Sequence, residues 1–343
     1  MATYEEAGVN IDLGDKCSSI AYNAAKDTFV GRKGMIGAAL LDEGGFTGAL
    51  DMGDYLLVQN DDGVGTKMEV AEKTDSFDTL GYDLVAMVAD DAACVGAETI
   101  SITNTLDVDK LNEDRVKILM GGLQKAALEH KIVVPGGEIA ELSSALNGWV
   151  WNATAVGIVE KHKIITGTTI KVGDKIIGLR SVGFRSNGLS LVRHILKNKF
   201  GEDWANAKYD DSNTWGQKAL IPSKIYCSAI MEMHGRYKEQ AKVELKGVVH
   251  VTGGGIPGNI VRVLKKCGLG ANLNNLPAPH DPMLKLIEMG NVKKEEAYRT
   301  WNMGVGMILI SNDVDQIEEI CKKHNIGMQV IGEVQAGGIK IDM

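Results

Sequence analysis

The stretch Asp62-Gly63-Val64-Gly65-Thr66-Lys67 decides how this chain is organised. An apolar run, Tyr55-Leu56-Leu57-Val58, precedes it, so we expect the stretch at the C-terminal end of a strand, where α/β proteins commonly place ligands. Gly63 and Gly65 expose backbone N–H groups, and Lys67 adds a cation, Thr66 a hydroxyl and Asp62 a carboxylate. This pattern predicts a phosphate-binding turn, although its spacing is not that of the Walker A loop. The alternative is a glycine-containing turn that only joins two elements.

Carboxylates follow in a segment that is otherwise apolar. Within residues 81–96 the apolar side chains Leu84, Met87 and Val88 recur at helical spacing, which predicts a core helix. Asp83, Asp90 and Asp91 interrupt it, and the adjacent carboxylates of Asp90 and Asp91 are costly to bury unless a positive charge is present. Mg²⁺ is the natural candidate for that charge, and solvation at a helix end is the alternative.

Glycine corners recur along the chain. A strand at 132–134 is expected to open onto a glycine turn at 135–141 that carries Glu141. Ser186-Asn187-Gly188 precedes a helix expected at 189–197, and this loop predicts either an anion or ribose site or an ordinary capped helix start. Residues 252–259, rich in glycine, follow a strand that ends in His250. The Gly-rich segment 31–50 is expected to be a mobile cover or a surface loop.

Composition limits the class of protein. The chain has 343 residues, enough for two domains, and strands and helices alternate in both halves, which predicts two α/β domains with a boundary between residues 165 and 166. The net charge of −8 argues against a nucleic-acid-binding surface. We expect no membrane span or secretory signal, because no apolar run is long enough. The five cysteines lie far apart, which favours reduced thiols in a cytoplasmic protein.

Taken together and in this order, eight sequence segments resemble those of the phosphoribosylformylglycinamidine cyclo-ligase family, also called the aminoimidazole ribonucleotide (AIR) synthetase family. They are residues 4–11, Gly44-Gly45-Phe46, residues 62–67, Gly81-Tyr82-Asp83-Leu84-Val85-Ala86-Met87, Gly136-Gly137-Glu138-Ile139-Ala140-Glu141, Ser186-Asn187-Gly188-Leu189-Ser190-Leu191-Val192-Arg193, His250-Val251-Thr252-Gly253-Gly254-Gly255 and Asn302-Met303-Gly304-Val305-Gly306-Met307.

The resemblance implies a fold and a reaction. It implies an N-terminal ATP- and Mg²⁺-binding domain, residues 1–165, that dimerises through its sheet into a β-barrel, and a C-terminal domain of the AIR-synthetase type, residues 166–343. The implied reaction is ATP-dependent closure of formylglycinamidine ribonucleotide to AIR, with release of ADP and phosphate. ATP is expected to phosphorylate the formyl oxygen, after which the amidine nitrogen attacks that carbon and phosphate leaves.

The resemblance also implies site residues by motif. Asp62, Asp91 and Glu141 become candidate Mg²⁺ ligands, and His250, Asp91 and Lys67 candidate catalytic residues. His250 has a pKa range suited to moving the amidine proton, the alternative being a core histidine with its hydrogen bonds satisfied. The candidate ATP and phosphate contacts are Gly44, Gly45, Gly63, Gly65, Thr66 and Lys67. The candidate substrate contacts are Arg185, Ser186, Asn187, Gly253, Gly254 and Gly255.

Three positions depart from the family pattern. Asp90 stands where the family usually has an asparagine, and Arg185 stands where it often has a histidine. An arginine there is suited to binding a phosphate. Residues 142–146 replace a loop that usually contains Met-Pro-Gly.

Other functions share parts of this pattern. Thiamine-monophosphate kinase, selenophosphate synthetase and hydrogenase-maturation proteins belong to the same superfamily and use ATP and Mg²⁺. Asp90-Asp91-Ala92-Ala93 is similar to the acidic motif of the kinase. Against the selenium enzyme, no reactive cysteine lies in a Gly-rich N-terminal loop beside a lysine, and Cys17 after Lys16 is the one cysteine to test. The phrases at 8–11 and 186–193 favour the cyclo-ligase. A nucleotide-binding regulator without turnover is a further alternative, against which the retained acids and Lys67 argue.

Overall fold

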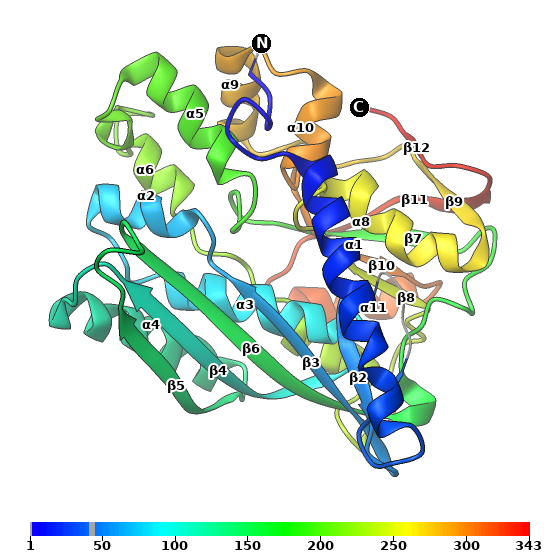
Figure 1. Cartoon of the computed structure of the whole chain (residues 1–343). Helices are drawn as coiled ribbons and strands as arrows, with labels where there is room; N and C mark the ends of the chain where they lie inside the picture. The colour runs from blue at the N-terminus through cyan, green and yellow to red at the C-terminus, as the bar shows by residue number, and fades with distance from the viewer. Residues whose placement is uncertain (1, 41–44) are drawn as a thin grey trace.

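The computed structural model describes residues 2–40 and 45–343, and in these residues the chain forms two mixed sheets, one in each half (Figure 1). The first sheet has the strand order β1-β2-β3-β6-β4-β5 and the second the order β12-β9-β11-β7-β10-β8. Neighbouring strands are antiparallel except in the pairs β4–β5 and β9–β12. The predicted α/β class with a sheet in each half is confirmed, and the first sheet is open within one chain, ending at β1 and β5.

The strands are β1 (Ala38–Leu40), β2 (Gly48–Asp51), β3 (Tyr55–Gly63), β4 (Glu98–Val108), β5 (Val133–Glu141), β6 (Trp149–Glu160), β7 (Lys175–Arg180), β8 (Gly247–His250), β9 (Leu269–Leu273), β10 (Val305–Ile310), β11 (Met328–Ala336) and β12 (Lys340–Ile341). The α-helices are α1 (Ile11–Asp27), α2 (Lys67–Thr74), α3 (Leu80–Ala93), α4 (Glu113–Glu129), α5 (Leu189–Phe200), α6 (Trp215–Ala219), α7 (Cys227–His234), α8 (Gly255–Leu264), α9 (Asp281–Gly290), α10 (Lys294–Thr300) and α11 (Val314–Lys323). Short 3₁₀ turns are η1 (Phe29–Arg32), η2 (Lys161–Lys163), η3 (Trp204–Asn206) and η4 (Lys265–Cys267).

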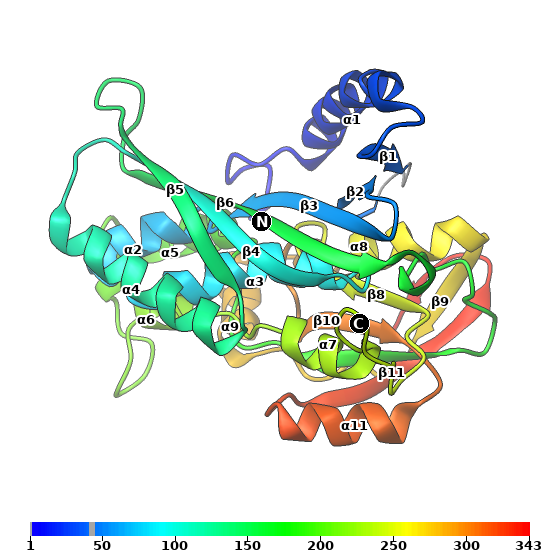
Figure 2. The same ribbon diagram turned by 90° about the horizontal axis from the view of Figure 1, so that it is seen from below.

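Helix α3 lies at the centre of the molecule. It packs against β3 and β6 of the first sheet and against α7 and β8 of the second half, which explains why nearly every position of the helix is buried. The alternation of β6 matches this arrangement, because Trp149, Trp151 and Ala153 are buried on the side of α3 while Val150 between them is exposed. Figure 2 shows α3 and α4 on one side of the first sheet, with the other side of β4 and β6 uncovered.

The segment predicted as a strand with a glycine turn is a continuous strand. β5 runs from Val133 through both glycines to Glu141 and pairs in parallel with β4. The reason is the close approach of the two strands: a Cβ atom on Gly137 would lie 2.7 Å from the backbone oxygen of Asn104. Gly137 therefore permits strand pairing rather than a turn, and the prediction of a turn at 135–141 was wrong.

Two sequence predictions concern membrane-spanning helices and the state of the cysteines. Among the described residues, no helix combines the length and the apolar composition that a membrane span requires. All five cysteines are free thiols, and Cys17 is the exposed one while Cys94, Cys227 and Cys321 are buried.

Candidate active site

The turn after β3 faces the second half of the chain. Gly63 still pairs with Asn152 of β6, and a Cβ atom there would lie 2.1 Å from the Asn152 side-chain oxygen, so this glycine is needed by the sheet. Gly65 has φ +53°, and its Cβ position lies 3.7 Å from the backbone oxygen of Ser186. Thr66 Oγ1 lies 3.5 Å from Ser190 Oγ at the start of α5. The turn thus lies directly against the Ser-Asn-Gly loop.

The start of α5 carries no side-chain cap. Gly188, at φ +75°, precedes the helix, and a Cβ atom there would lie 2.5 Å from the ring of Trp301. Ser186 Oγ is buried without a hydrogen-bond partner, and Asn187 Nδ2 reaches only Met87 Sδ, at 3.7 Å. The interpretation as an ordinary capped helix start therefore does not describe this loop, and its polar groups remain available to an anion or a ribose.

The three glycines before α8 differ from one another. Gly255 has φ +60°, and a Cβ atom there would lie 1.9 Å from the Tyr298 backbone oxygen, so this glycine is required by packing. Gly254 has φ +92°. Gly253 is open, since the nearest atom to its Cβ position is Asn187 Oδ1 at 3.7 Å. Gly253 is thus the position of this corner that faces the Ser-Asn-Gly loop.

Two carboxylates, those of Asp62 and Asp91, lie near each other in the same region. His250, at the end of β8, contacts Asp91 of α3 through Nδ1 and Oδ1 at 2.7 Å. Asp62, at the end of β3, is close enough to Asp91 for the Asp91 charge to raise the pKa of Asp62. His250 is fully buried, whereas Asp91 keeps 14% of its side chain exposed. The structure therefore brings together Asp62, Asp91 and His250, which are far apart in the sequence.

Burial explains the electrostatics of this group. Burial, together with the smaller effect of the nearby Asp91 charge, raises the pKa of Asp62 to about 6. Burial likewise raises the pKa of Asp91 to about 7, against the effect of Arg262 and Arg185. Burial lowers the pKa of His250 to about 3, and the Arg185 charge acts in the same direction. Two carboxylates are thus held near each other at a site where a cation would be favourable.

Lys67 is placed differently from the phosphate contact that the motif implies. Its ammonium group is fully buried and donates to Asp83 Oδ1 and to the Ile221 backbone oxygen, both at 2.7 Å. Asp83 Oδ1 also accepts from the backbone N–H of Ser223 at 3.0 Å. Burial lowers the pKa of Lys67, and the charge of Asp83 opposes this. Lys67 therefore joins α2 and α3 of the first half to a loop of the second half.

Glu141 lies apart from the other predicted metal ligands. In the strand register, Asp62 of β3 lies opposite Gly137 of β5, with β6 and β4 between them. Three strand spacings separate Asp62 from Gly137 by about 14 Å, and Glu141 lies roughly 13 Å farther along β5. Glu141 accepts from the backbone N–H of Leu111 at 2.8 Å. Because β5 continues as a strand, it carries Glu141 away from Asp62 and Asp91 within one chain.

Gly45 and Phe46 contact Arg262, a cation that lies near the carboxylates. Gly44 lies outside the described residues. The Gly45 backbone oxygen accepts from Arg262 of α8, whose guanidinium carbon lies 4.1 Å from the centre of the Phe46 ring. Arg262 also lowers the pKa of Asp91, which places this cation near the carboxylates.

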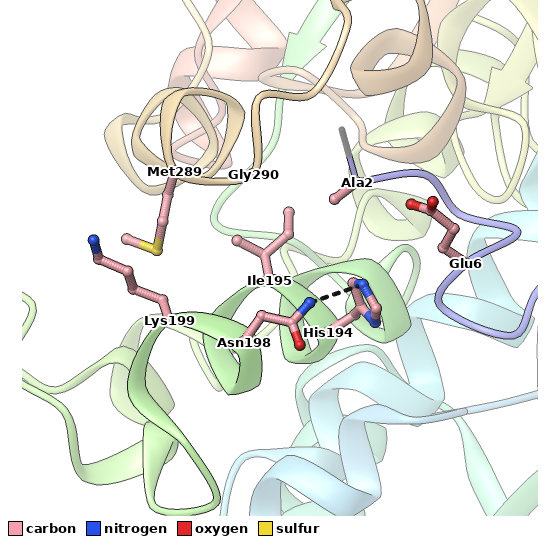
Figure 3. Close-up of a pocket in the computed structure, with 8 residues that line it drawn as sticks. All are labelled: Ala2, Glu6, His194, Ile195, Asn198, Lys199, Met289 and Gly290. Carbon is pink, nitrogen blue, oxygen red and sulfur yellow. Dashed lines mark hydrogen bonds between the residues drawn. The ribbon is translucent and has the colours of Figure 1, made fainter.

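A cavity of about 500 Å³ lies elsewhere, and none of the predicted site residues lines it. Figure 3 shows it between the N-terminal segment, α5 and the end of α9. Its polar side chains include His194 and Asn198, which are one turn apart on α5 and bond to each other at 3.0 Å. It lacks converging carboxylates, so size alone does not identify the site.

Sequence reasoning missed two residues of this region. Asp83, the partner of Lys67, is noticeable in the sequence only as a carboxylate on an apolar helix. Nothing in the sequence shows which cation it pairs with. Arg262, a cation near Asp91, lies seven residues after Gly255 in α8. Its position is visible only once α8 is packed beside β8.

Family models match both halves of the chain. The model of the AIR synthase related protein N-terminal domain matches residues 44–159, and that of the C-terminal domain matches residues 171–342. Curated relatives include the phosphoribosylformylglycinamidine cyclo-ligase of Pyrococcus furiosus, 39% identical over 93% of this chain and 91% of the relative. The enzyme of the same name from Methanocaldococcus jannaschii is 39% identical over 97% of this chain and 92% of its own length.

Solved structures resemble the fold at much lower identity. Thiamine-monophosphate kinase from Stenotrophomonas maltophilia aligns with a TM-score of 0.60 at 16% identity, covering 92% of this chain and 95% of the kinase. T. maritima PurL complexed with FGAR aligns with a TM-score of 0.59 at 15% identity, covering 92% of this chain and 47% of PurL. These likenesses show the fold, while the two domain matches and the relatives at 39% identity show that the chain belongs to the phosphoribosylformylglycinamidine cyclo-ligase (AIR synthetase) family.

Proposed function

We propose that the protein closes the imidazole ring of formylglycinamidine ribonucleotide, using ATP and releasing ADP, phosphate and AIR. The observation that supports this most is that the turn at 62–66, the loop at 186–188 and Gly253 lie against one another, with Asp62 of that turn close to Asp91. Backbone N–H groups at such corners suit phosphates, and the two acids suit the cation that accompanies a triphosphate. The relatives of the same name, at 39% identity, support the same reaction.

Asp62 and Asp91 are the residues that we propose to hold Mg²⁺. Mg²⁺ in nucleotide sites is commonly bound by one or two carboxylates together with phosphate oxygens and water, so two acids are enough. Among the described residues, no group of three or more His, Cys, Asp or Glu side chains could hold a metal ion on its own. We therefore propose that the cation binds as a complex with the ATP phosphates. When bound, the ion would neutralise charge on the transferred phosphoryl group. Within one chain, Glu141 lies too far from Asp62 to bind the same ion.

The remaining residues bind and orient the two ligands. ATP would transfer its γ-phosphoryl group to the formyl oxygen, which turns a poor leaving group into a good one. The amidine nitrogen would then form the C–N bond as phosphate departs. We assign Gly65 and Thr66 to the phosphates and Ser186, Asn187 and Gly253 to the ribonucleotide. The contribution of the protein is therefore positioning, charge neutralisation and exclusion of water.

The ring-closing assay tests this function directly. Purified protein with ATP, Mg²⁺ and formylglycinamidine ribonucleotide is expected to release one ADP for each AIR formed, both measured chromatographically. Without the ribonucleotide, ADP release is expected to fall to background. Release that ignores this ribonucleotide but responds to thiamine phosphate or selenide would replace the assignment with one of the superfamily alternatives, and no turnover with any of them would favour a nucleotide-binding regulator.

We also propose that two copies pair through the first sheet, as the predicted dimeric barrel requires. The uncovered face and edge of this sheet expose the apolar residues Ile100, Val133, Ile139 and Val150, each more than a third exposed. Light scattering is expected to give twice the chain mass at micromolar concentration, and Ile139→Glu is expected to shift the protein toward monomer. A monomeric parent protein would contradict this. The cytoplasmic location stays a prediction from the sequence.

A further inference from the structure

Arg185 is buried in the loop between β7 and α5, although its type and motif suggested a substrate contact. Its side chain is 1% exposed, and its backbone has φ +59°, a conformation that non-glycine residues rarely adopt. Nη1 donates to the Lys224 backbone oxygen at 2.6 Å, and the guanidinium carbon lies 5.0 Å from the centre of the Tyr226 ring. The guanidinium group is therefore fully surrounded by protein and does not face the open corners.

The Nη2 atom of Arg185 joins two residues of other elements. It donates to Asp90 Oδ2 at 3.0 Å and lies 2.8 Å from His250 Nε2. The other oxygen of Asp90 accepts from the backbone N–H groups of Tyr226 and Cys227, at 2.8 and 2.9 Å, at the start of α7. Asp90 is thus fully committed to Arg185 and to a helix N-terminus, and is not available as a metal ligand.

The chemistry of these groups fixes the protonation of His250. A guanidinium group has only donors and stays charged in proteins, so His250 Nε2 must be the acceptor. A neutral imidazole with an unprotonated Nε2 carries its proton on Nδ1, which lies 2.7 Å from Asp91 Oδ1. His250 therefore donates to Asp91, and both of its ring nitrogens are engaged. This geometry fits the alternative of a satisfied core histidine and leaves no free nitrogen for proton transfer.

We propose that Arg185 is a positioning residue that fixes the tautomer of His250 and, through it, the orientation of Asp91. His250 holds one oxygen of Asp91, so the other oxygen is the one that the partly exposed side chain can offer to a cation. The buried pair of Arg185 and Asp90 fixes the donor in place. The role of Asp91 toward Mg²⁺ rests on the function proposed above, whereas the tautomer does not.

The tautomer is measurable without any ligand. In protein labelled with ¹⁵N-histidine, long-range ¹H–¹⁵N spectra at pH 7.5 distinguish protonated from unprotonated ring nitrogens, and His250→Gln identifies the His250 signals among the seven histidines. We expect a protonated Nδ1 and an unprotonated Nε2. A protonated Nε2 would overturn the proposal. Since the spectrum needs no substrate, this failure is distinct from a failure of the ring-closing assay.

A double variant separates positioning from substrate binding. Asp90→Asn combined with Arg185→Met removes both buried charges, so neither is left alone. We expect His250 to lose its single tautomer, and the Mg²⁺ concentration for half-maximal activity to rise about 10–100-fold, as for outer-shell partners of metal ligands. The KM for the ribonucleotide is expected to stay within about twofold, and Arg185→Lys to be intermediate. An unchanged tautomer, or a loss confined to the ribonucleotide KM, would overturn the proposal.

Discussion

Asp62→Asn is expected to stabilise the ligand-free protein at pH 7.5 and to abolish its binding of Mg-ATP. Burial and the neighbouring Asp91 charge raise the pKa of Asp62 from 3.8 to about 6. The folded state therefore binds more protons than the unfolded state between about pH 4 and 6, and stability falls as pH rises through this range. At about 1.4 kcal/mol per pKa unit, removing the charge contributes up to about 3 kcal/mol at pH 7.5.

The same substitution removes an oxygen that we assign to Mg²⁺. We expect activity to fall about 10²–10³-fold, the usual loss of one group that stabilises charge in the transition state. Thermal melts at pH 5 and 7.5, with and without Mg-ATP, measure both effects. The gain in stability should be larger at pH 7.5, and Mg-ATP should no longer raise the melting temperature.

A neighbouring aspartate supplies the control. Asp61 is exposed on the other face of β3 and accepts from Thr154 Oγ1 across the strand pair. Asp61→Asn removes the same charge one residue away. It is expected to leave nucleotide binding and activity within about twofold of the parent. If Asp62→Asn bound Mg-ATP as the parent does, the assignment of Asp62 to the cation would be wrong.

Lys67→Met is expected to destabilise the fold by about 3–5 kcal/mol, the usual cost of breaking a buried ion pair by removing one partner. Lys67 and Asp83 are fully buried and lie 2.7 Å apart, and Asp83 Oδ2 has no partner of its own. Without the ammonium group, Asp83 keeps only Ser223 as a donor. Urea unfolding measures the loss.

The double variant Lys67→Met with Asp83→Asn distinguishes the two roles of Lys67. If Lys67 supports the fold, removing both charges should recover much of the lost stability, because a neutral pair leaves no unpaired charge. If Lys67 instead contacts a phosphate, as the motif implied, the single variant would keep its stability and lose Mg-ATP binding. That second result would contradict the role that the structure gives to Lys67.

The sequence predicts the local features of the site well, since they depend on neighbours in the chain. Apolar spacing identified α3 as a core helix, and the glycines of the 62–66 turn marked a real corner. The same local reasoning failed at Gly137, because glycine permits a turn and a close strand approach alike, and only the position of Asn104 decides between them. The difference matters, because the continuous strand carries Glu141 away from Asp62 and Asp91 within one chain.

The pairings of buried charges were not predictable from local pattern. Asp90 and Asp91 are adjacent, yet Asp90 pairs with Arg185 of a loop about 95 residues away and Asp91 with His250 of β8 about 160 residues away. The signal was present in part: Asp90 and Arg185 are both departures from the family pattern, and their charges are opposite. In the structure these two side chains form a buried ion pair. Lys67 and Asp83 are likewise paired only after the halves pack.

A crystal structure with Mg²⁺ and a non-hydrolysable ATP analogue tests the proposed Mg-ATP site most directly. We expect oxygens of both Asp62 and Asp91 about 2.1 Å from the Mg²⁺ ion, the usual Mg²⁺–oxygen distance, with the phosphates against Gly65 and Thr66. An ion bound well away from both carboxylates, with the triphosphate outside the corner formed by residues 62–66 and 186–188, would contradict it.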